Sequence, residues 1–280
     1  TITAAGLYKA PGLPFIAGNE AAGEVIAVGP GVTNFHPGDR VAYYENLGGY
    51  ATERNIGWQR LVKLPDHITY EQGAVLMLKG LTAQYLIRQT YRVKAGETIL
   101  LHAAAGGVGL ILSQWAKHLG VTVIGTVSSD DKAQLAKAHG CAHSIIYTRE
   151  DFVARVSEIT GGKKVPVVYD SVGKDTFLKS LDCLAPLGYA VLFGQSSGSV
   201  DPLNLGLLAQ KGSLFVTRPT LFTYAAKRES LVAMANELFD VVKSGAVKIE
   251  VNQTYPLKEA ARAHADLAAR KTTGSTVLLV

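Results

Sequence analysis

Residues 100–120 read LLHAAAGGVGLILSQWAKHLG, and this stretch decides the fold of the 280-residue chain. An apolar strand runs into a turn of alanine and glycine, and a helix begins at once. The first N–H groups of a helix lack partners within the helix, and the helix dipole favours an anion there. Because small residues let a phosphate group approach the backbone, the stretch predicts a phosphate-binding strand–turn–helix unit.

The small residues of this turn match the dinucleotide fingerprint GxGxxG at two of its three glycine positions. Gly106 and Gly109 occupy the second and third positions, and Ala104 stands at the first. On its own the motif is also consistent with a tight turn that only needs glycine. The strand, turn, helix and second strand follow in the order that the binding mechanism requires, so we predict a bound dinucleotide.

Strands alternate with helices from about residue 81 to about residue 220. Helices are expected over 109–119, 129–140, 150–162 and 175–188, and strands over 97–103, 121–127, 143–147, 165–173 and 189–194. Such alternation predicts right-handed βαβ units and an α/β fold of the Rossmann type, with a doubly wound parallel sheet covered on both faces.

The end of the second strand indicates which dinucleotide binds. An NAD site usually carries Asp or Glu there, about 20 residues after the turn, to hold the ribose 2′-hydroxyl. Here Ser128 follows the strand, and the carboxylates come later, in the first turn of the next helix. Lys132 and Tyr147 add an ammonium and a phenol, which suit a 2′-phosphate. We therefore predict NADPH; the alternatives are a solvated Lys132 and a Tyr147 that only packs at the sheet edge.

The two ends of the chain differ from the middle in the pattern of their predicted secondary structure. Short strands and turns fill residues 1–80, with a hairpin expected over 23–44 and its first strand at Val25–Val28. A helix over 227–245, the stretch 247–257, another helix and a final strand over 275–280 resume this mixed pattern. We predict a β-rich substrate domain from 1–80 and 221–280, and a dinucleotide-binding domain over 81–220.

Composition favours a cytoplasmic protein with a small ligand. The net charge of +5 is spread along the chain, without the contiguous basic and aromatic face of a nucleic-acid binder. No apolar run reaches the roughly 18 residues that cross a bilayer. Cys141 and Cys183 have no metal-type spacing and are expected to be buried thiols. The chain begins with Thr1, so we expect a missing or processed N-terminal piece.

Six motifs together resemble one family, the zinc-free, zeta-crystallin-like quinone oxidoreductases of the medium-chain dehydrogenase/reductase superfamily. The motifs are GNEAAGEVIAVGPGV (18–32), FHPGDRVA (35–42), LKGLTAQYL (78–86), HAAAGGVGLILSQWAKHLG (102–120), GGKKVPVVYDSVG (161–173) and QKGSLFVTRP (210–219). The resemblance implies NADPH-dependent, zinc-independent reduction of a quinone, and a GroES-like fold for the β-rich domain, whose first strands are expected to be missing here.

The resemblance also implies cofactor-binding residues. The pyrophosphate is expected at Gly106, Gly107 and Val108, and the 2′-phosphate at Ser128, Lys132 and Tyr147. The nicotinamide end is expected near Thr82, Ser171, Phe193, Gly194, Gln195 and Arg270. Three of these residues also have an ordinary structural alternative. Phe193 could be a core side chain, Thr82 a helix residue bonded to its own backbone, and Arg270 a surface arginine. His102 and Asp170 are expected to be structural.

The motif at Gly18 separates this chain from the zinc-dependent relatives, which carry Gly-His-Glu. Asn19 replaces the histidine and is a poor zinc ligand, so we predict no metal. Ile2 and Ala4 stand where the family has Tyr and Arg, so no catalytic residue is assigned beyond Thr82 as a nicotinamide-positioning candidate. A homodimer through the strand near 213–220 is expected. Open alternatives are an enone or enal reductase, and an NADPH-binding protein with a nucleic-acid-binding or structural role.

Overall fold

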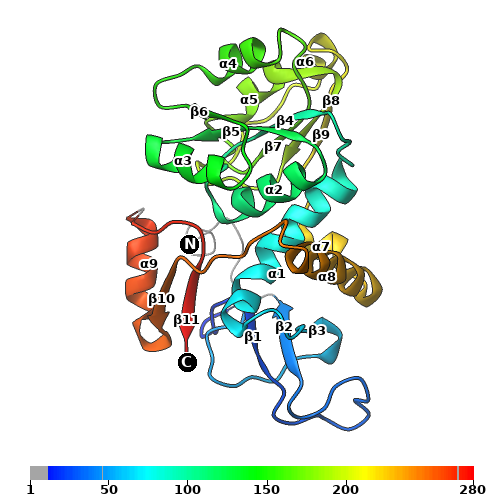
Figure 1. Cartoon of the computed structure of the whole chain (residues 1–280), viewed down its shortest axis with the longest axis vertical. Helices are drawn as coiled ribbons and strands as arrows, with labels where there is room; N and C mark the ends of the chain where they lie inside the picture. Colours follow the sequence, from blue (N-terminus) through cyan, green and yellow to red (C-terminus); the bar gives the residue numbers. More distant parts are fainter. Residues whose placement is uncertain (1–11, 46, 270) are drawn as a thin grey trace. The chain divides into compact units, whose positions relative to one another are not determined.

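The structure is a computed structural model that describes residues 12–45, 47–269 and 271–280 (Figure 1). The chain divides into two compact units. The α/β unit is Thr82–Thr223, and the mixed unit combines Thr1–Leu81 with Tyr224–Val280. Among the described residues, no helix has both the length and the apolar character to cross a lipid bilayer.

A six-stranded parallel sheet forms the centre of the α/β unit. The strand order is β6-β5-β4-β7-β8-β9, and each neighbouring pair is parallel. The strands are β4 (Thr98–Leu101), β5 (Thr122–Val127), β6 (His143–Ile146), β7 (Val165–Asp170), β8 (Leu184–Leu192) and β9 (Phe215–Thr217). The chain starts in the middle and winds outward in both directions, which is the dinucleotide-binding order. The predicted doubly wound sheet is confirmed.

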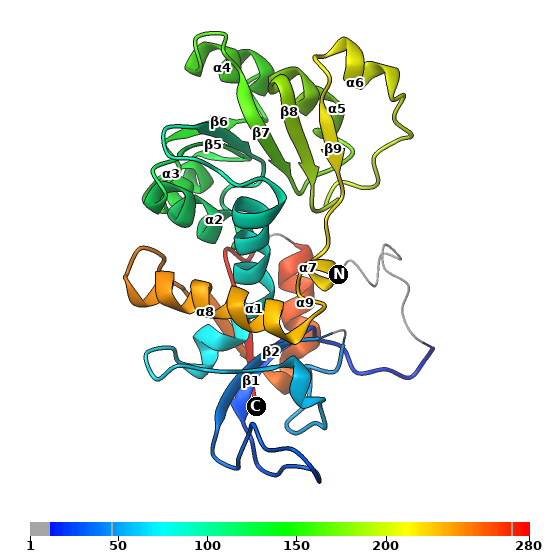
Figure 2. The same ribbon diagram turned by 90° about the vertical axis from the view of Figure 1, so that its right-hand side faces the viewer.

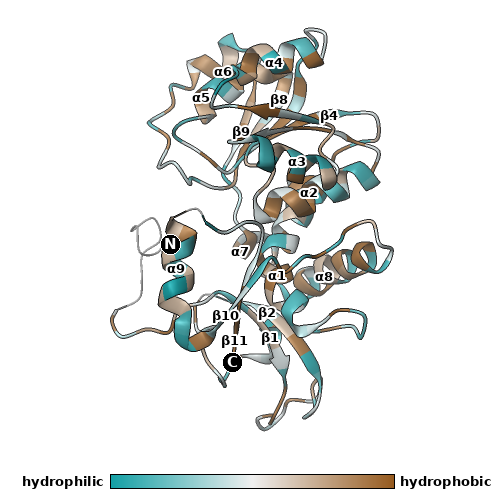
Figure 3. Ribbon diagram, turned by 60° about the vertical axis from the view of Figure 1, so that its left-hand side comes forward, coloured by the Kyte–Doolittle hydropathy of each residue, from teal (hydrophilic) through white to brown (hydrophobic). Residues whose placement is uncertain are grey.

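Helices cover both faces of this sheet. They are α2 (Gly107–His118), α3 (Asp130–Ala138), α4 (Phe152–Ile159), α5 (Phe177–Ser180) and α6 (Gly206–Gln210). The unit also contains a π-helical segment, η2 (Leu86–Thr90), and a 3₁₀ helix, η3 (Leu181–Cys183). Figure 2 shows α2 and α3 on one side of the sheet and α4 and α5 on the other, as right-handed crossovers require. The strands are mostly brown in the hydropathy colouring of Figure 3, and apolar side chains on them such as Leu100 and Ile124 are fully buried.

Local sequence explains where these helices begin. The Ser129 hydroxyl accepts a hydrogen bond from the Lys132 N–H at 3.4 Å and caps α3. The Asp151 carboxylate accepts from the N–H groups of Val153 and Ala154, at 2.8 and 3.0 Å, and caps α4. Both caps satisfy N–H groups that a helix leaves open. The result fixes α3 directly after the end of β5.

The mixed unit contains two small sheets and the longer helices. Strands β1 (Glu20–Glu24), β2 (Arg40–Tyr44) and β3 (Leu61–Lys63) are antiparallel, and β10 (Gln253–Pro256) pairs in parallel with β11 (Thr276–Leu279). The helices are α1 (Tyr70–Tyr85), α7 (Leu221–Tyr224), α8 (Arg228–Lys243) and α9 (Ala260–Ala268), with η1 (Trp58–Arg60) and η4 (Leu257–Glu259). Helix α1 continues into the α/β unit, and α7 spans the other boundary.

Two sequence predictions of elements are wrong in position. The strand expected at Val25–Val28 lies earlier, at β1, because Glu20–Glu24 pairs with Arg40–Tyr44. The helix expected over 175–188 ends at Ser180, and β8 already begins at Leu184. A proline and a left-handed Leu187 with φ of 61° cannot continue a helix there.

Candidate functional site

The turn between β4 and α2 leaves the helix N-terminus open. Ala103 adopts a left-handed backbone with φ of 54°, and its carbonyl accepts a hydrogen bond from the Gly106 N–H at 2.9 Å. Gly106 is the N-cap of α2, is exposed, and receives no cap from any described side chain. The N–H groups that begin the helix, from Gly107 and Val108, therefore face a place where an anion is stabilised.

Gly109 has a packing role next to this turn. A Cβ atom at this position would lie 2.6 Å from the carbonyl oxygens of Ala103 and of Ala104. At Gly106 the closest contact of a Cβ atom would be 3.2 Å, to the Ala103 oxygen. The third glycine of the fingerprint thus lets α2 approach the strand end, and the second leaves the backbone bare.

The ends of β5 and β6 bring together the residues predicted to bind a 2′-phosphate. The Tyr147 N–H donates to the Val127 carbonyl at 3.1 Å, and the Thr148 hydroxyl donates to the Ser128 carbonyl at 3.3 Å. Lys132 lies in the first turn of α3, and Tyr147 is 46 % exposed. These residues occupy one edge of the sheet with accessible polar groups, so the chemistry of a phosphate site is present there.

An arginine that the sequence analysis missed also lies at this edge. Arg149 donates from both terminal nitrogens to the carboxylate of Asp130, at 2.8 and 2.6 Å. The hydrogen bond from Arg149 lowers the pKa of Asp130, and Asp130 in turn raises the pKa of Arg149. The residues are 19 positions apart, and their only sequence signal is that each follows the end of one of two neighbouring strands.

The loops after β7 and β8 are joined by one buried carboxylate. Asp170, which is 1 % exposed, accepts hydrogen bonds through Oδ1 from the N–H groups of Val172 and Gly173, at 2.7 and 3.0 Å. Its backbone carbonyl accepts from the Phe193 N–H at 2.8 Å. Ser171 lies within the first loop, and Phe193, Gly194 and Gln195 form the second. Asp170 therefore fixes both loops that carry predicted nicotinamide-end residues.

Close contact between these loops requires glycine at two positions. A Cβ atom on Gly194 would lie 2.7 Å from the Ser171 carbonyl oxygen. Gly173 has φ of 89°, and a Cβ atom there would lie 2.7 Å from the Gly198 carbonyl oxygen. At these glycines the loops after β7 and β8 therefore present backbone without a side chain, as the turn before α2 does.

A buried polar network extends inward from Asp170. His102 is 1 % exposed, its Nδ1 lies 2.9 Å from the Thr126 hydroxyl, and its Nε2 lies 2.9 Å from the Ser180 hydroxyl. The Ser180 and Thr176 hydroxyls both donate to Asp170 Oδ2, at 3.4 and 2.7 Å. Burial lowers the pKa of His102, although the Asp170 charge opposes this. The expectation of a packed, hydrogen-bonded His102 is confirmed.

For two of the predicted residues, the structure does not show a position at this edge of the sheet. Thr82 is buried, with 8 % exposure, near the start of the α/β unit in the last part of α1. Arg270 lies outside the described residues. Both assignments stay predictions.

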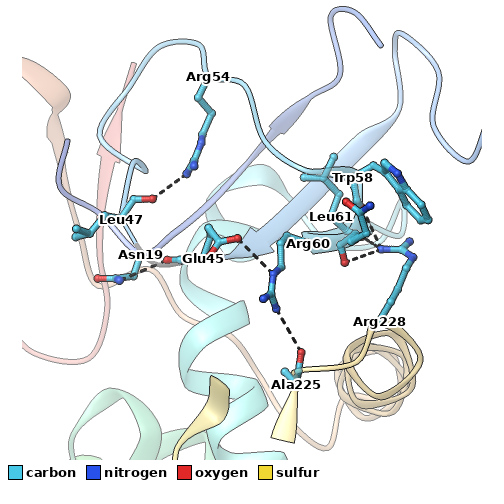
Figure 4. A network of polar contacts seen from close by, with 10 residues as sticks. Asn19, Glu45, Leu47, Arg54, Trp58, Arg60, Leu61, Ala225 and Arg228 are labelled. Atoms are coloured by element: carbon cyan, nitrogen blue, oxygen red, sulfur yellow. Dashed lines mark hydrogen bonds and ion pairs between the residues drawn. The ribbon is translucent and has the colours of Figure 1, made fainter. Parts of the chain in front are cut away.

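The position at which zinc-dependent relatives carry histidine is engaged in other contacts. The Asn19 amide donates to the Glu45 carbonyl at 3.4 Å, and the Glu45 carboxylate pairs with Arg60 at 3.4 Å (Figure 4). Glu20 accepts from the Leu78 N–H at 2.7 Å and from the Lys79 ammonium at 3.1 Å. Across the described part of the chain, no three His, Cys, Asp or Glu side chains cluster as metal ligands. This donor set does not fit a catalytic zinc ion.

Both cysteines are free and buried. Burial raises the pKa of Cys141, and it raises the pKa of Cys183 to about 12. A thiol reacts as its thiolate, which is scarce at neutral pH under these conditions. Both side chains are therefore buried thiols, as the sequence predicts.

Comparisons with known families and proteins agree with this arrangement. The family described as zinc-binding dehydrogenase matches residues 107–236, and the alcohol dehydrogenase GroES-like domain matches residues 1–97. A quinone oxidoreductase of Pseudomonas aeruginosa is 61 % identical over 275 residues, which cover 98 % of this chain and 85 % of the relative. A 2-haloacrylate reductase of Burkholderia sp. is 50 % identical over 270 residues, covering 95 % and 81 %.

A solved structure shares the fold over nearly the whole chain. The structure of an Escherichia coli quinone oxidoreductase complexed with NADPH superposes with a TM-score of 0.96 at 52 % identity. The match covers 99 % of this chain and 86 % of that chain. The predicted Rossmann-like parallel sheet and a GroES-like N-terminal domain are thereby confirmed.

Proposed function

Since the chain belongs to the zinc-free quinone oxidoreductases of the medium-chain dehydrogenase/reductase superfamily, we propose that it reduces quinones with NADPH. One observation in the structure carries this proposal. A single edge of the α/β sheet combines an uncapped helix N-terminus at α2 with hydroxyl, ammonium and phenol groups after β5 and β6. These are the groups that NADPH requires for its pyrophosphate and its 2′-phosphate.

We assign the predicted residues to parts of the cofactor on this basis. Gly106, Gly107 and Val108 bind the pyrophosphate through their backbone. A second set, Ser128, Lys132 and Tyr147, holds the 2′-phosphate. The ribose and ring of the nicotinamide lie against the remaining residues, Thr82, Ser171, Phe193, Gly194, Gln195 and Arg270. We assign NADPH binding to residues 81–220 and the acceptor to the domain made of 1–80 and 221–280.

The chemistry divides between cofactor and chain. NADPH supplies the hydride when it is bound. The chain contributes orientation: the rigid loops after β7 and β8 position the nicotinamide end, and the helix α2 fixes the pyrophosphate. A quinone accepts electrons readily, so the reaction needs no Lewis acid to polarise the acceptor. The overall change converts one quinone and one proton into a hydroquinone as NADPH becomes NADP⁺.

A second candidate activity is reduction of a conjugated carbonyl compound, such as an enone or enal. The 2-haloacrylate reductase with 50 % identity supports it, because its substrate by name also contains a conjugated double bond. The same hydride serves both reactions, and only the acceptor differs.

The test is oxidation of NADPH by the purified chain, followed by absorbance at saturating concentrations of a simple quinone, an enone and 2-chloroacrylate. Turnover with the quinone at least tenfold above that with the other acceptors supports a quinone reductase. Preference for the enone or haloacrylate would support the second candidate. A chain that binds NADPH but oxidises it with none of them would refute both activities.

We also propose a cytoplasmic homodimer. In the part of the chain that the structure describes, β9 is the last strand of the sheet, and Phe215 and Val216 on it are 49 % and 40 % exposed. An exposed apolar edge strand is stabilised by pairing with another strand, and a second copy offers an identical one. Sedimentation velocity of the wild type and of Val216→Lys measures this: a dimer that dissociates in the variant supports the proposal, and a monomeric wild type contradicts it.

A further inference from the structure

The first residue of α3 creates a charge problem for the proposed 2′-phosphate site. Asp130 follows Ser128 by two positions, directly beyond the end of β5, and it is exposed. A carboxylate in this region is suited to a ribose 2′-hydroxyl and repels a phosphate monoester, which carries close to two negative charges at neutral pH. An enzyme that prefers NADPH needs a means of cancelling this charge.

Arg149 lies where it cancels the Asp130 charge. Two parallel hydrogen bonds, of 2.8 and 2.6 Å, join its guanidinium to both carboxylate oxygens. This bidentate geometry is the strongest that an arginine and a carboxylate form, and it occupies both oxygens at once. The result is a neutral pair in place of an anion at the edge of the site.

The backbone holds the arginine in position. The Arg149 N–H donates to the Ile146 carbonyl at 3.0 Å, and the preceding Thr148 hydroxyl donates to the Ser128 carbonyl at 3.3 Å. The loop after β6 is thereby tied to the loop after β5, so the approach of Arg149 to Asp130 follows from strand pairing.

The neighbouring carboxylate of Glu150 makes its hydrogen bond and its ion pair with groups other than Arg149. Glu150 accepts the Ile146 N–H at 2.8 Å, and it pairs with the Arg155 Nε at 3.1 Å. Arg149 is therefore directed to Asp130 alone among the ion pairs of the described residues.

We propose that Arg149 is a specificity-determining residue that secures the preference for NADPH by neutralising Asp130 beside the 2′-phosphate. The inference rests on the proposed function, because it presupposes that NADPH binds at this edge. An exposed ion pair contributes little to stability, so its role here is selection between coenzymes rather than support of the fold.

The experiment compares dissociation constants of NADPH and NADH, by fluorescence titration, for the wild type, Arg149→Gln, Asp130→Asn and the double variant. Removing Arg149 exposes the Asp130 charge, so NADPH binding weakens about fivefold or more while NADH binding changes less than about twofold. In the double variant NADPH affinity returns to within about twofold of Asp130→Asn, because no carboxylate is left to repel the phosphate. Arg262→Gln is the control for the change in net charge, because Arg262 on α9 also forms an exposed ion pair, with Glu259.

Three results would overturn the inference and leave the proposed cofactor in place. Equal weakening of both coenzymes would indicate a structural role, and no change in either would show that the pair is irrelevant. A double variant as weak as Arg149→Gln would show that Arg149 binds the phosphate directly. A wild type without preference for NADPH would instead refute the proposed cofactor, and the inference with it.

Discussion

Two pairs of loops lie at the same edge of one sheet and are built in opposite ways. The loops after β5 and β6 present exposed side chains, with Tyr147, Arg149 and Asp130 all accessible. The loops after β7 and β8 are held by a buried carboxylate and by glycines in contact with backbone. The first pair selects a ligand through charge, and the second positions it through rigid backbone. Substitutions in the second pair are therefore expected to affect stability, and those in the first only binding.

The largest effect is expected at Asp170. Asp170→Ala removes an acceptor that two N–H groups and two hydroxyls share, and the N–H groups of Val172 and Gly173 lose their side-chain acceptor, at a cost of about 3 kcal/mol. Asp170→Asn keeps one acceptor oxygen and is expected to cost about half as much. Urea denaturation measures both variants. Equal stability of wild type and Asp170→Ala would contradict the joining role of this side chain.

Gly194 is the next most sensitive position. Gly194→Ala places a methyl group 2.7 Å from the Ser171 carbonyl oxygen, so the two loops must separate. We expect a loss of about 2 kcal/mol and weaker binding of NADPH and NADH alike. Gly29→Ala is the matched control, because a Cβ atom there meets nothing within 4 Å. If both alanine variants unfold at the same denaturant concentration, the close approach of the loops is not required.

The His102 network predicts a dependence of stability on pH. Burial lowers the pKa of folded His102, whereas the unfolded chain binds a proton near pH 6.5. The unfolded state is therefore favoured as the pH falls below about 6.5, at up to about 1.4 kcal/mol per pH unit. Between pH 6.5 and 5.5, His102→Gln should lose less stability than the wild type. His118→Gln, at an exposed position on α2, should follow the wild-type curve.

The smallest effect on stability is expected at Lys132, in the first pair of loops. Lys132→Gln removes an ammonium proposed to bind the 2′-phosphate, so NADPH affinity falls about tenfold and NADH affinity is unchanged. The unfolding midpoint stays at the wild-type value. Parallel titrations with both coenzymes measure the effect, and an equal loss for both would place Lys132 outside the phosphate site.

The contrast between these loops also explains what the sequence could predict. Strand–helix alternation and the glycine turn were sufficient for a doubly wound parallel sheet and for α2, because both follow from local patterns. Arg149 was missed because its partner is 19 residues away and comes from a neighbouring strand. The end of the helix near Ser180 was missed although Pro186 was visible, because the apolar run around it resembles a helix face. Strand β1 was misplaced because its register depends on pairing with β2.

The central claim is that this sheet edge binds NADPH through its 2′-phosphate. The most direct measurement is a paired titration of the wild-type chain with NADPH and NADH at the same salt concentration. The account predicts a dissociation constant for NADPH at least tenfold lower, which corresponds to about 1.4 kcal/mol. Equal constants, or tighter binding of NADH, would contradict the assignment of Ser128, Lys132 and Tyr147.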